Sequence, residues 1–363
     1  MILSLYMTKS FFIRFLTMML GLAVFLQMLD LMANADVILE GGGKPLQVLS
    51  LYTLWRIPSI IETVAPLAGL LAALTTLVVL ANNSEIIAMR AAGRSVLSLV
   101  AGLVFAGFLS SIMLFVFSDQ VVVKFNAKLE DWRSTGYRPG GQTIEGTEAW
   151  VIEDGTIIRV GNVLKNGTVL NDIRLFFQKD SFDIHNIINI RLAIWESDSW
   201  KLFEVESVGG VDNNLNNNRL KKIKSWETKL VPADFNKLAN PPSELSYDEL
   251  EHYVREVALG TRPSYYYDTW LQQKIAGPVV LALMPLLAAI AAFAQQRHGS
   301  AIIVIIYGIS LGFFFIVTDN LLLAMGQFGA LPPFLAAWLP LGLFAIIGLW
   351  ILFNLENNNS SSL

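Results

Sequence analysis

The sequence VLSLVAGLVFAGFLSSIMLFVF, residues 96–117, is the clearest indication of the architecture of this chain, because no charged residue interrupts it. An α-helix needs ~20 apolar residues to cross the ~30 Å hydrocarbon core of a bilayer. Surface helices of soluble proteins keep a polar face over such a length. The stretch therefore predicts a membrane-spanning helix.

Five further stretches are apolar over a comparable length, and a long polar block separates the first three spans from the last three. Hydrophobic residues make up 54% of the chain, charged residues 15%, and the mean hydropathy is +0.52, outside the usual range of soluble proteins. We expect a polytopic α-helical membrane protein with six transmembrane helices in a 3+3 arrangement. The further spans are Phe11 to Leu31, Pro58 to Ala81, Ile275 to Phe293, Ile302 to Ala324 and Pro333 to Phe353.

Basic residues gather in alternate short connections, as they do on the cytoplasmic side of membrane proteins. They are Lys9 and Arg14, Arg90 and Arg94, and Arg297. Both termini are therefore predicted to be cytoplasmic and the polar block to lie outside the inner face of the membrane, which in a Gram-negative cell is the periplasm. The alternative for the first span is a cleaved signal peptide ending near Ala33-Asn34-Ala35. Its length and Asp30 favour an uncleaved helix.

The polar block, residues 129–262, alternates apolar and polar residues in short runs that are typical of strands. Asp154-Gly155 and Asn166-Gly167 favour tight turns between the runs. The pattern predicts an inserted periplasmic β-jelly-roll or sandwich domain. A helix should follow, beginning after Ser246 with acidic residues in its first turn and ending at Gly260. The predicted domains are thus residues 1–128, 129–262 and 263–363.

A short, separately capped helix is predicted between the second and third spans, over residues 84–93. Ser84 suits the N-cap, Glu85 the first turn, and Gly93 the left-handed C-terminal position.

The faces of this short helix differ in character. Ile86 and Met89 form an apolar face, while Glu85 and Arg90 offer opposite charges to a docking partner. The alternative is an amphipathic linker resting on lipid headgroups. Glu85 fits an anionic surface poorly, which favours a protein partner, such as an ATPase that delivers force to the spans.

Acidic residues at the ends of the spans are further candidates, because ionised groups inside a bilayer usually face a cavity or a partner. Asp30, Glu62, Asp119 and Asp319 could form a polar rim above an apolar cavity, or could be interfacial and helix-pairing acids. Lys124 and Lys128, four residues apart on one helix face, could bind phosphates or extend to the interface. The cavity wall would come from the first and fifth spans, with Phe25, Leu29, Phe314, Phe315 and Leu322, although ordinary helix packing also explains such residues.

Enzyme signatures are weak in this sequence. Cysteine is absent, which excludes thiol nucleophiles, and the three histidines lie in different regions, so no metal site is expected. The run from Gly41 to Lys44 lacks the serine or threonine of a phosphate-binding loop. No basic run indicates nucleic-acid binding.

A lipid-modifying enzyme using span-end carboxylates remains the alternative function. A receptor would need a cytoplasmic output domain, which the short polar tail from Asn354 does not supply.

Four segments carry a resemblance to a known family. They are residues 84–93, the Pro58 to Pro66 spacing, the segment from Leu230-Val231-Pro232 to Tyr253, and Gly312 to Asp319. In these the chain resembles the LptF/LptG (YjgP/YjgQ) family, the permeases of the ABC exporter that extracts lipopolysaccharide from the inner membrane. The resemblance covers essentially the whole chain. Trp270, Lys274 and the run Trp195 to Leu202 bring it closer to the LptG branch.

The resemblance implies a permease subunit that passes lipopolysaccharide to a periplasmic bridge. Its implied partners are an LptF-like permease subunit, a dimeric LptB-like ATPase, an LptC-like bitopic protein and an LptA-like bridge. No cofactor is expected on this chain, since the ATPase would use ATP and Mg²⁺. Glu85 matches the acid that docks in the ATPase.

One departure from the family lies near the periplasmic end of the first span. Family members carry basic substrate contacts there, whereas this chain has Gln27, Ala33 and Asn34 around Asp30. Lys44, Lys124 and Lys128 are the alternative headgroup contacts. The implied mechanism is lateral entry of the lipid between spans one and five, followed by compression of the cavity when the ATPase closes.

Overall fold

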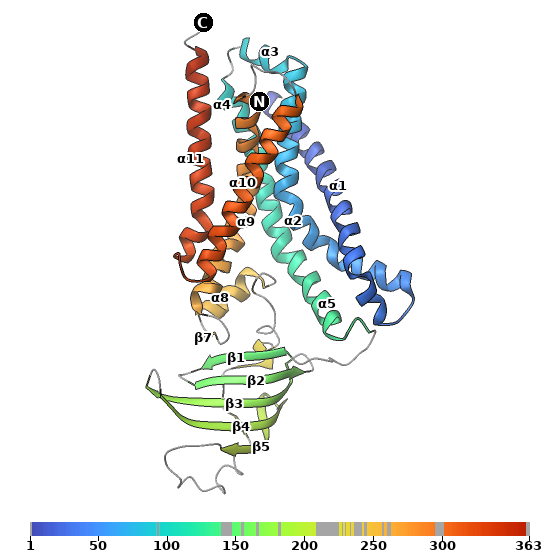
Figure 1. Cartoon of the computed structure of the whole chain (residues 1–363), viewed down its shortest axis with the longest axis vertical. Coiled ribbons are helices and arrows are strands. Elements are labelled where there is room, and N and C mark those ends of the chain that lie inside the picture. Colours follow the sequence, from blue (N-terminus) through green and yellow to red (C-terminus); the bar gives the residue numbers. More distant parts are fainter. Residues whose placement is uncertain are drawn as a thin grey trace. The chain divides into compact units, whose positions relative to one another are not determined.

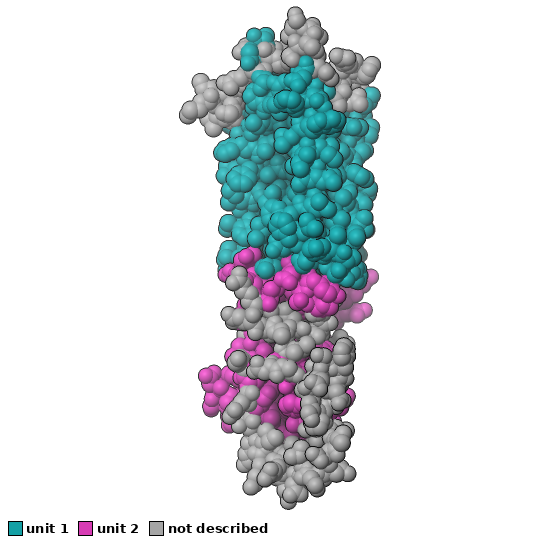
Figure 2. Space-filling view, turned by 90° about the vertical axis from the view of Figure 1, so that its left-hand side faces the viewer, with its two compact units in different colours: residues 1–35, 49–126, 269–363 teal, residues 36–48, 127–268 magenta. Residues whose placement is uncertain are grey.

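The computed structural model describes all residues except 1, 92, 94, 139–146, 154–155, 165–166, 181–182, 208–224, 227, 229, 233, 236–241, 243–244, 256–257, 260–262, 295–300 and 361–363. The chain divides into two compact units, coloured separately in Figure 2. A helical unit comprises residues 1–35, 49–126 and 269–363. A second unit comprises residues 36–48 and 127–268. The predicted Asp154-Gly155 turn, Asn166, Gly260, Arg94 and Arg297 lie outside the described residues.

Six helices among the described residues are long and apolar enough to cross a membrane, which confirms the predicted spans (Figure 1). Most extend beyond the apolar stretches that predicted them. The first has 39 residues, or ~58 Å at ~1.5 Å per residue, about twice the hydrocarbon thickness. The spans are α1 (Ile2–Glu40), α2 (Pro45–Asn82), α4 (Val96–Phe117), α9 (Ser264–Ala294), α10 (Ala301–Gln327) and α11 (Pro333–Ser360).

The third span continues past its apolar stretch through a change of helix type. The π-helical turn η1 (Ser118–Val122) follows α4 directly, and α5 (Val123–Ser134) follows η1. A π-helical turn inside an α-helix often marks a functional or strained position. Here the buried Ser118 donates a hydrogen bond to Glu62 of α2 at 2.5 Å, so the turn is tied to the neighbouring span.

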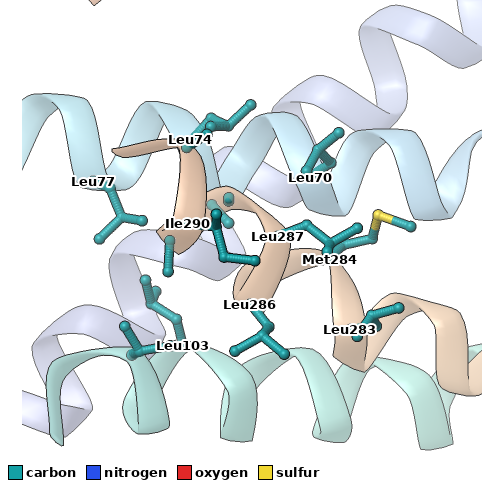
Figure 3. Packing of buried hydrophobic residues seen from close by; sticks show 14 of the residues in the cluster. Leu70, Leu74, Leu77, Leu103, Leu283, Met284, Leu286, Leu287 and Ile290 are labelled. Atoms are coloured by element: carbon teal, nitrogen blue, oxygen red, sulfur yellow. The ribbon is translucent and has the colours of Figure 1, made fainter. Parts of the chain in front are cut away.

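The core of the helical unit lies around α9, which is the most buried of the spans. Figure 3 shows leucines of α2 and α4 on either side of α9, whose own apolar side chains fill the space between them. Small residues allow close approach here. A Cβ added to Gly107 of α4 would lie 3.0 Å from the Leu281 carbonyl oxygen of α9.

A second close contact joins α10 to α2. Gly308 and Gly312 are four residues apart, as in the small-xxx-small pattern of membrane helices. Added Cβ atoms there would overlap the side chains of Leu74 and Leu70 of α2. The glycines therefore leave room for these two leucine side chains of α2 against α10.

The second unit contains an antiparallel sheet, which confirms a separate β-domain inserted between the two sets of spans. The strands described lie in the order β6-β5-β4-β3-β2-β1-β7, so neighbours along the chain are mostly neighbours in the sheet. In the described part of the chain the strands thus follow one another as a meander within one sheet. The strands are β1 (Thr147–Glu153), β2 (Thr156–Leu164), β3 (Val169–Asp180), β4 (Asp183–Glu196), β5 (Ser199–Ser207), β6 (Ser225–Trp226) and β7 (Ala258–Leu259).

One face of the sheet is apolar, because the strands alternate as predicted. Ile158 and Val160 are buried, while Arg159 between them pairs with Asp172 at 3.0 Å on the other face. Trp200 is fully buried on the apolar face. Its indole Nε1 donates to the Leu230 carbonyl at 2.9 Å, so its polar atom is satisfied.

Helix α8 (Tyr247–Arg255) begins with the predicted cap. The Ser246 hydroxyl accepts from the Glu249 amide at 3.2 Å, and the Glu249 carboxylate accepts from the Ser246 amide at 3.0 Å. This reciprocal pair is a capping box. After α8 the chain returns to the sheet, where β7 pairs with β1 at Leu259 and Val151.

Candidate functional site

The predicted short helix between the second and third spans is present as α3 (Glu85–Ala91). Figure 1 shows it at the end of the helical unit where α1 begins and α11 ends. Gly93 has a φ of +80°, the left-handed conformation predicted for it. The connections that join α3 to α2 and to α4 are short.

The predicted N-cap role of Ser84 is wrong. Its carbonyl accepts from the Ala88 amide at 3.1 Å, so it stands at the cap position. Its φ of +57° is left-handed, however, whereas a capping serine is extended, and no capping bond of its side chain is found in the described residues. The carboxylate of Glu85 instead accepts from Asn83 Nδ2 at 3.2 Å.

The apolar face of α3 points into the chain rather than away from it. Ile86 is 5% exposed and belongs to the core of the helical unit, and Met89 packs against that core. Ile86 is therefore inaccessible to a partner, and the expected partner contact at this residue is corrected. Exposed positions of α3 include Ala88 and Ala91, with Glu85 half-buried. The side chain of Arg90 lies outside the described part.

A polar cluster joins α1 to α2 at Asp30. Arg56 of α2 places Nη2 and Nε each 3.4 Å from Asp30 Oδ1. Tyr52, one turn earlier on α2, donates to Asp30 Oδ2 at 2.7 Å and is 1% exposed. The acid near the end of the first span is thus a paired, anchored carboxylate.

Neither Arg56 nor Tyr52 was among the residues predicted for a site. Arg56 stands two residues before Pro58, at the edge of the apolar stretch that predicted the second span. Arg56 could have been found from its place near the start of the second span, opposite Asp30 near the end of the first. Two antiparallel helices bring these two positions together. A basic side chain therefore does lie beside Asp30, on the second span and not on the first.

The other acids of the spans have separate partners. Glu62 accepts from Ser118, and Asp319 of α10 accepts a side-chain hydrogen bond from Gln273 of α9. Asp119 accepts from the adjacent Gln120 at 3.1 Å and is half-buried. The contacts of Glu62 and Asp319 each join two helices and fit helix pairing, which was one of the two interpretations of these acids, whereas the contact of Asp119 lies within one helix.

The predicted cavity wall divides into exposed and buried members. Phe25, Leu29 and Phe314 are largely exposed, on the two spans that are least buried within the chain, α1 and α10. Phe315 is 1% exposed and packs edge-on against Phe344 of α11 at a centroid distance of 5.1 Å. Phe315 is therefore a core residue, and its predicted role in lipid contact is wrong. Leu322 is half-buried.

The lysines predicted as headgroup contacts are all exposed. Lys44 precedes α2, and Lys124 and Lys128 lie on α5. Of these, Lys124 belongs to the helical unit, whereas Lys44 and Lys128 belong to the second unit. In the described part of the chain, no group of three or more His, Asp or Glu side chains could hold a metal ion.

Comparison with known proteins agrees with this arrangement of spans and sheet. The profile of the family described as lipopolysaccharide export system permease LptF/LptG matches residues 5–354. The lipopolysaccharide export system permease protein LptG of Escherichia coli K12 is 22% identical over 342 residues, covering 93% of this chain and 95% of that protein. The protein of the same name from Haemophilus influenzae is 28% identical over 323 residues, covering 83% and 84%. The chain belongs to the LptF/LptG family of lipopolysaccharide export permeases.

Proposed function

We propose that this chain, a permease subunit of the lipopolysaccharide export system, receives force from a separate ATPase through α3 and uses it to extract the lipid from the inner membrane. The observation that carries the proposal is the packing of α3. Ile86 and Met89 fix this helix to the core of the helical unit, while Ala88 and Ala91 face outward. A push on the outer face would therefore move the spans and not only a loop.

The proposed orientation places α3 and both ends of the chain in the cytoplasm. The start of α1, α3 and the end of α11 lie at one end of the helical unit (Figure 1). Lys9 and Arg14 lie at the start of α1, which supports a cytoplasmic location for that end. The sheet between the two sets of spans is then periplasmic, where it would pass the lipid to an LptA-like bridge.

The proposed assembly contains an LptF-like second permease, a dimeric LptB-like ATPase that uses ATP and Mg²⁺, and an LptC-like bitopic protein. Large apolar side chains of α1 and α10 are exposed in the isolated chain, which supports coverage of these spans by another subunit or by lipid. Phe25, Leu29, Phe314 and Leu322 are the proposed acyl-chain contacts. Lipopolysaccharide would enter beside these two spans and be driven toward the sheet when the cavity narrows.

The headgroup contacts proposed from the sequence are Lys44, Lys124, Lys128, Asp30 and Asp319. The structure leaves the lysines exposed and pairs the acids with Arg56 and Gln273. Exposure supports the lysines as phosphate contacts, whereas the paired acids are better suited to positioning neighbouring groups.

The alternative function, a lipid-modifying enzyme, has no specific support. Such an enzyme would need two carboxylates acting together as acid and base. Asp30, Glu62 and Asp319 instead each bond a different neutral or cationic side chain. The members of the family to which the chain belongs are components of a transporter and not enzymes.

The proposal predicts that Glu85→Ala weakens docking of the ATPase or uncouples hydrolysis from transport. Loss of a charge-assisted contact at an interface commonly costs tenfold or more in affinity, about 1.4 kcal/mol or above. The measurement is co-purification of the ATPase with the tagged chain, together with ATP hydrolysis and lipid release in proteoliposomes. Glu204→Ala, which removes an exposed carboxylate paired with Arg191 on the sheet, is the matched control.

A Glu85→Ala complex that is recovered in normal yield and exports lipid at the normal rate would contradict the docking role of this acid. Failure of the wild-type chain to recover any ATPase would contradict the proposed function itself.

A further inference from the structure

Three spans of the helical unit pack together at one level. The buried cluster at this level is formed by Ala65 of α2, Leu114 of α4 and Leu281 of α9. Consecutive spans run in opposite directions, so α2 and α9 are parallel and α4 is antiparallel to both. The α3 side of the cluster is the side on which α2 ends and α4 begins. On the other side, positions one turn beyond the cluster again share one level in the three helices.

The third span changes its helix type at that next level. The π-helical turn η1 begins at Ser118, four residues after Leu114. The Val123 amide donates to the Ser118 carbonyl five residues back, which is the bond of a π-helix. A π-helical turn inside an α-helix is among the usual places at which a helix axis bends.

The two neighbouring spans carry prolines at the same level. Pro66 of α2 has no N–H for the carbonyl of Glu62, four residues earlier. Pro278 of α9, three residues before Leu281, does the same to the carbonyl of Lys274. Proline is the other usual cause of helix bending. Three adjacent spans thus each have an irregular helix at one level.

A hydrogen bond joins two of these irregular positions. Ser118, the first residue of η1, donates to the carboxylate of Glu62, whose backbone carbonyl is the one that Pro66 cannot bond. Ser118 is 4% exposed, so the bond is shielded from water. A bend in α2 at this point would therefore carry η1 with it.

Packing is tight on the α3 side of this level. The buried members that α2 and α4 give to the main core cluster lie within residues 70–80 and 99–106, all on the α3 side, as far as the structure is described. Figure 3 shows part of this packing around α9. Ile86 of α3 belongs to the same cluster. The α3 side is therefore one packed block, and α3 is part of it.

The two least buried spans lack such irregular positions. α1 and α10 contain no proline, and each is one continuous α-helix over its described residues. Bending is thus built into the central helices α2, α4 and α9 and not into these two outer ones.

We propose that the level of Glu62, Ser118 and Pro278 is a hinge, at which the far segments of α2, α4 and α9 bend against the packed block that contains α3. The far segments are residues 49–61, 119–126 and 269–277. The inference rests on the proposed function and adds the place at which a push on α3 changes the shape of the spans. Without a hinge, the same push would move the spans as one body.

The test measures distances between pairs of spin labels in the assembled complex, with the cysteines of the other subunits replaced. Phe105→Cys with Leu54→Cys joins the packed block to the far segment of α2, while Phe105→Cys with Val79→Cys lies within the block. All three side chains are exposed. Leu54 is eight residues from Glu62, ~12 Å along the helix, so a bend of ~20° moves it by ~4 Å. Arresting the ATPase with vanadate should shift the first distance by this amount and leave the second unchanged.

Pro66→Ala supplies the missing N–H to the Glu62 carbonyl and should stiffen α2. The distance shift should be lost, and lipid release per ATP hydrolysed in proteoliposomes should fall several-fold. The midpoint of heat unfolding should not fall, because alanine favours the helix, so loss of structure would not explain the loss of transport. Pro58→Ala is the matched control. It removes the other proline of α2 and should keep both the shift and the release.

Other results would overturn the hinge. If the wild type exports lipid with both distances unchanged, or with both shifted alike, the inference fails and the proposed function stands. A shift that is lost in Pro58→Ala and kept in Pro66→Ala would place the bend elsewhere, with the same consequence. If the wild-type complex releases no lipid on ATP hydrolysis, the proposed function fails and the inference with it. Should Pro66→Ala not assemble, the two wild-type distances and the Pro58→Ala shift decide.

Discussion

Ser118 and Glu62 meet where α4 changes into the π-helical turn η1. Ser118 is 4% exposed, and its hydroxyl donates to the Glu62 carboxylate at 2.5 Å. The carboxylate lies half-buried in a membrane span, where an unpaired charge is expensive. This single hydrogen bond therefore stabilises both the acid and the altered helical turn.

Ser118→Ala should destabilise the protein by about 1–3 kcal/mol, because the half-buried carboxylate loses its donor. Ser110→Ala is the matched control, since Ser110 of α4 is buried as well but its hydroxyl donates to the Ala106 carbonyl of its own helix. The measurement is the apparent midpoint of heat unfolding in detergent. Equal midpoints for the two variants would show that the hydrogen bond to Glu62 does not contribute to the stability of the protein.

Single residues were the least predictable part of the candidate site. Asp30 was recognised as an acid inside a span, but its partners Arg56 and Tyr52 were not, since hydropathy does not say which polar residues of two helices meet. Ile86 and Phe315 were assigned to contacts with other molecules and are buried instead. An apolar residue on a membrane helix has the same sequence signal whether it faces lipid, a partner or the core.

The existence and direction of the spanning helices could be predicted, because a helix that crosses the bilayer must be both long and apolar. Val96–Phe117 was predicted to the residue, whereas α1 and α2 run well past their apolar stretches. Beyond the hydrocarbon region a helix continues without a hydropathy signal. In the sheet, alternation located the long strands, but the two-residue β7 has no periodicity from which to predict it.

The contact between α4 and α9 predicts unequal effects for two glycines of one helix. A Cβ on Gly107 would lie 3.0 Å from a backbone oxygen and 3.0 Å from Pro285 of α9, whereas a Cβ on Gly102 would meet nothing within 4 Å. Gly107→Ala should therefore separate the helices at a cost of about 1–3 kcal/mol. Gly102→Ala should be neutral or slightly stabilising, since alanine favours the helix. Thermal unfolding of both variants in one detergent measures the difference, and a Gly107→Ala protein as stable as Gly102→Ala would contradict this packing.

The whole molecule combines a helical unit with exposed apolar spans and a separate sheet. Burial within the chain is high for α9 and low for α1 and α10, so the isolated chain leaves two spans to be covered. The order of three spans, β-domain and three spans was predictable from the sequence alone. The molecule that covers α1 and α10 could not be predicted, because the sequence of one chain does not identify the molecules that the chain contacts.

On the proposed function, α3 carries force from a cytoplasmic ATPase to the spans. The chain has no cysteine, so a single introduced thiol is unique in it. Ala88→Cys places that thiol on the exposed side of α3, and Phe203→Cys places one on the exposed side of β5 as the control.

The decisive measurement is thiol crosslinking from these two positions in the assembled complex, in intact membranes. Force transmission through α3 predicts that Ala88→Cys crosslinks to the ATPase subunit and reacts with a membrane-impermeant maleimide only from the cytoplasmic side, while Phe203→Cys does neither. A thiol at position 88 that reacts from the periplasmic side, or that crosslinks only to phospholipid, would contradict it.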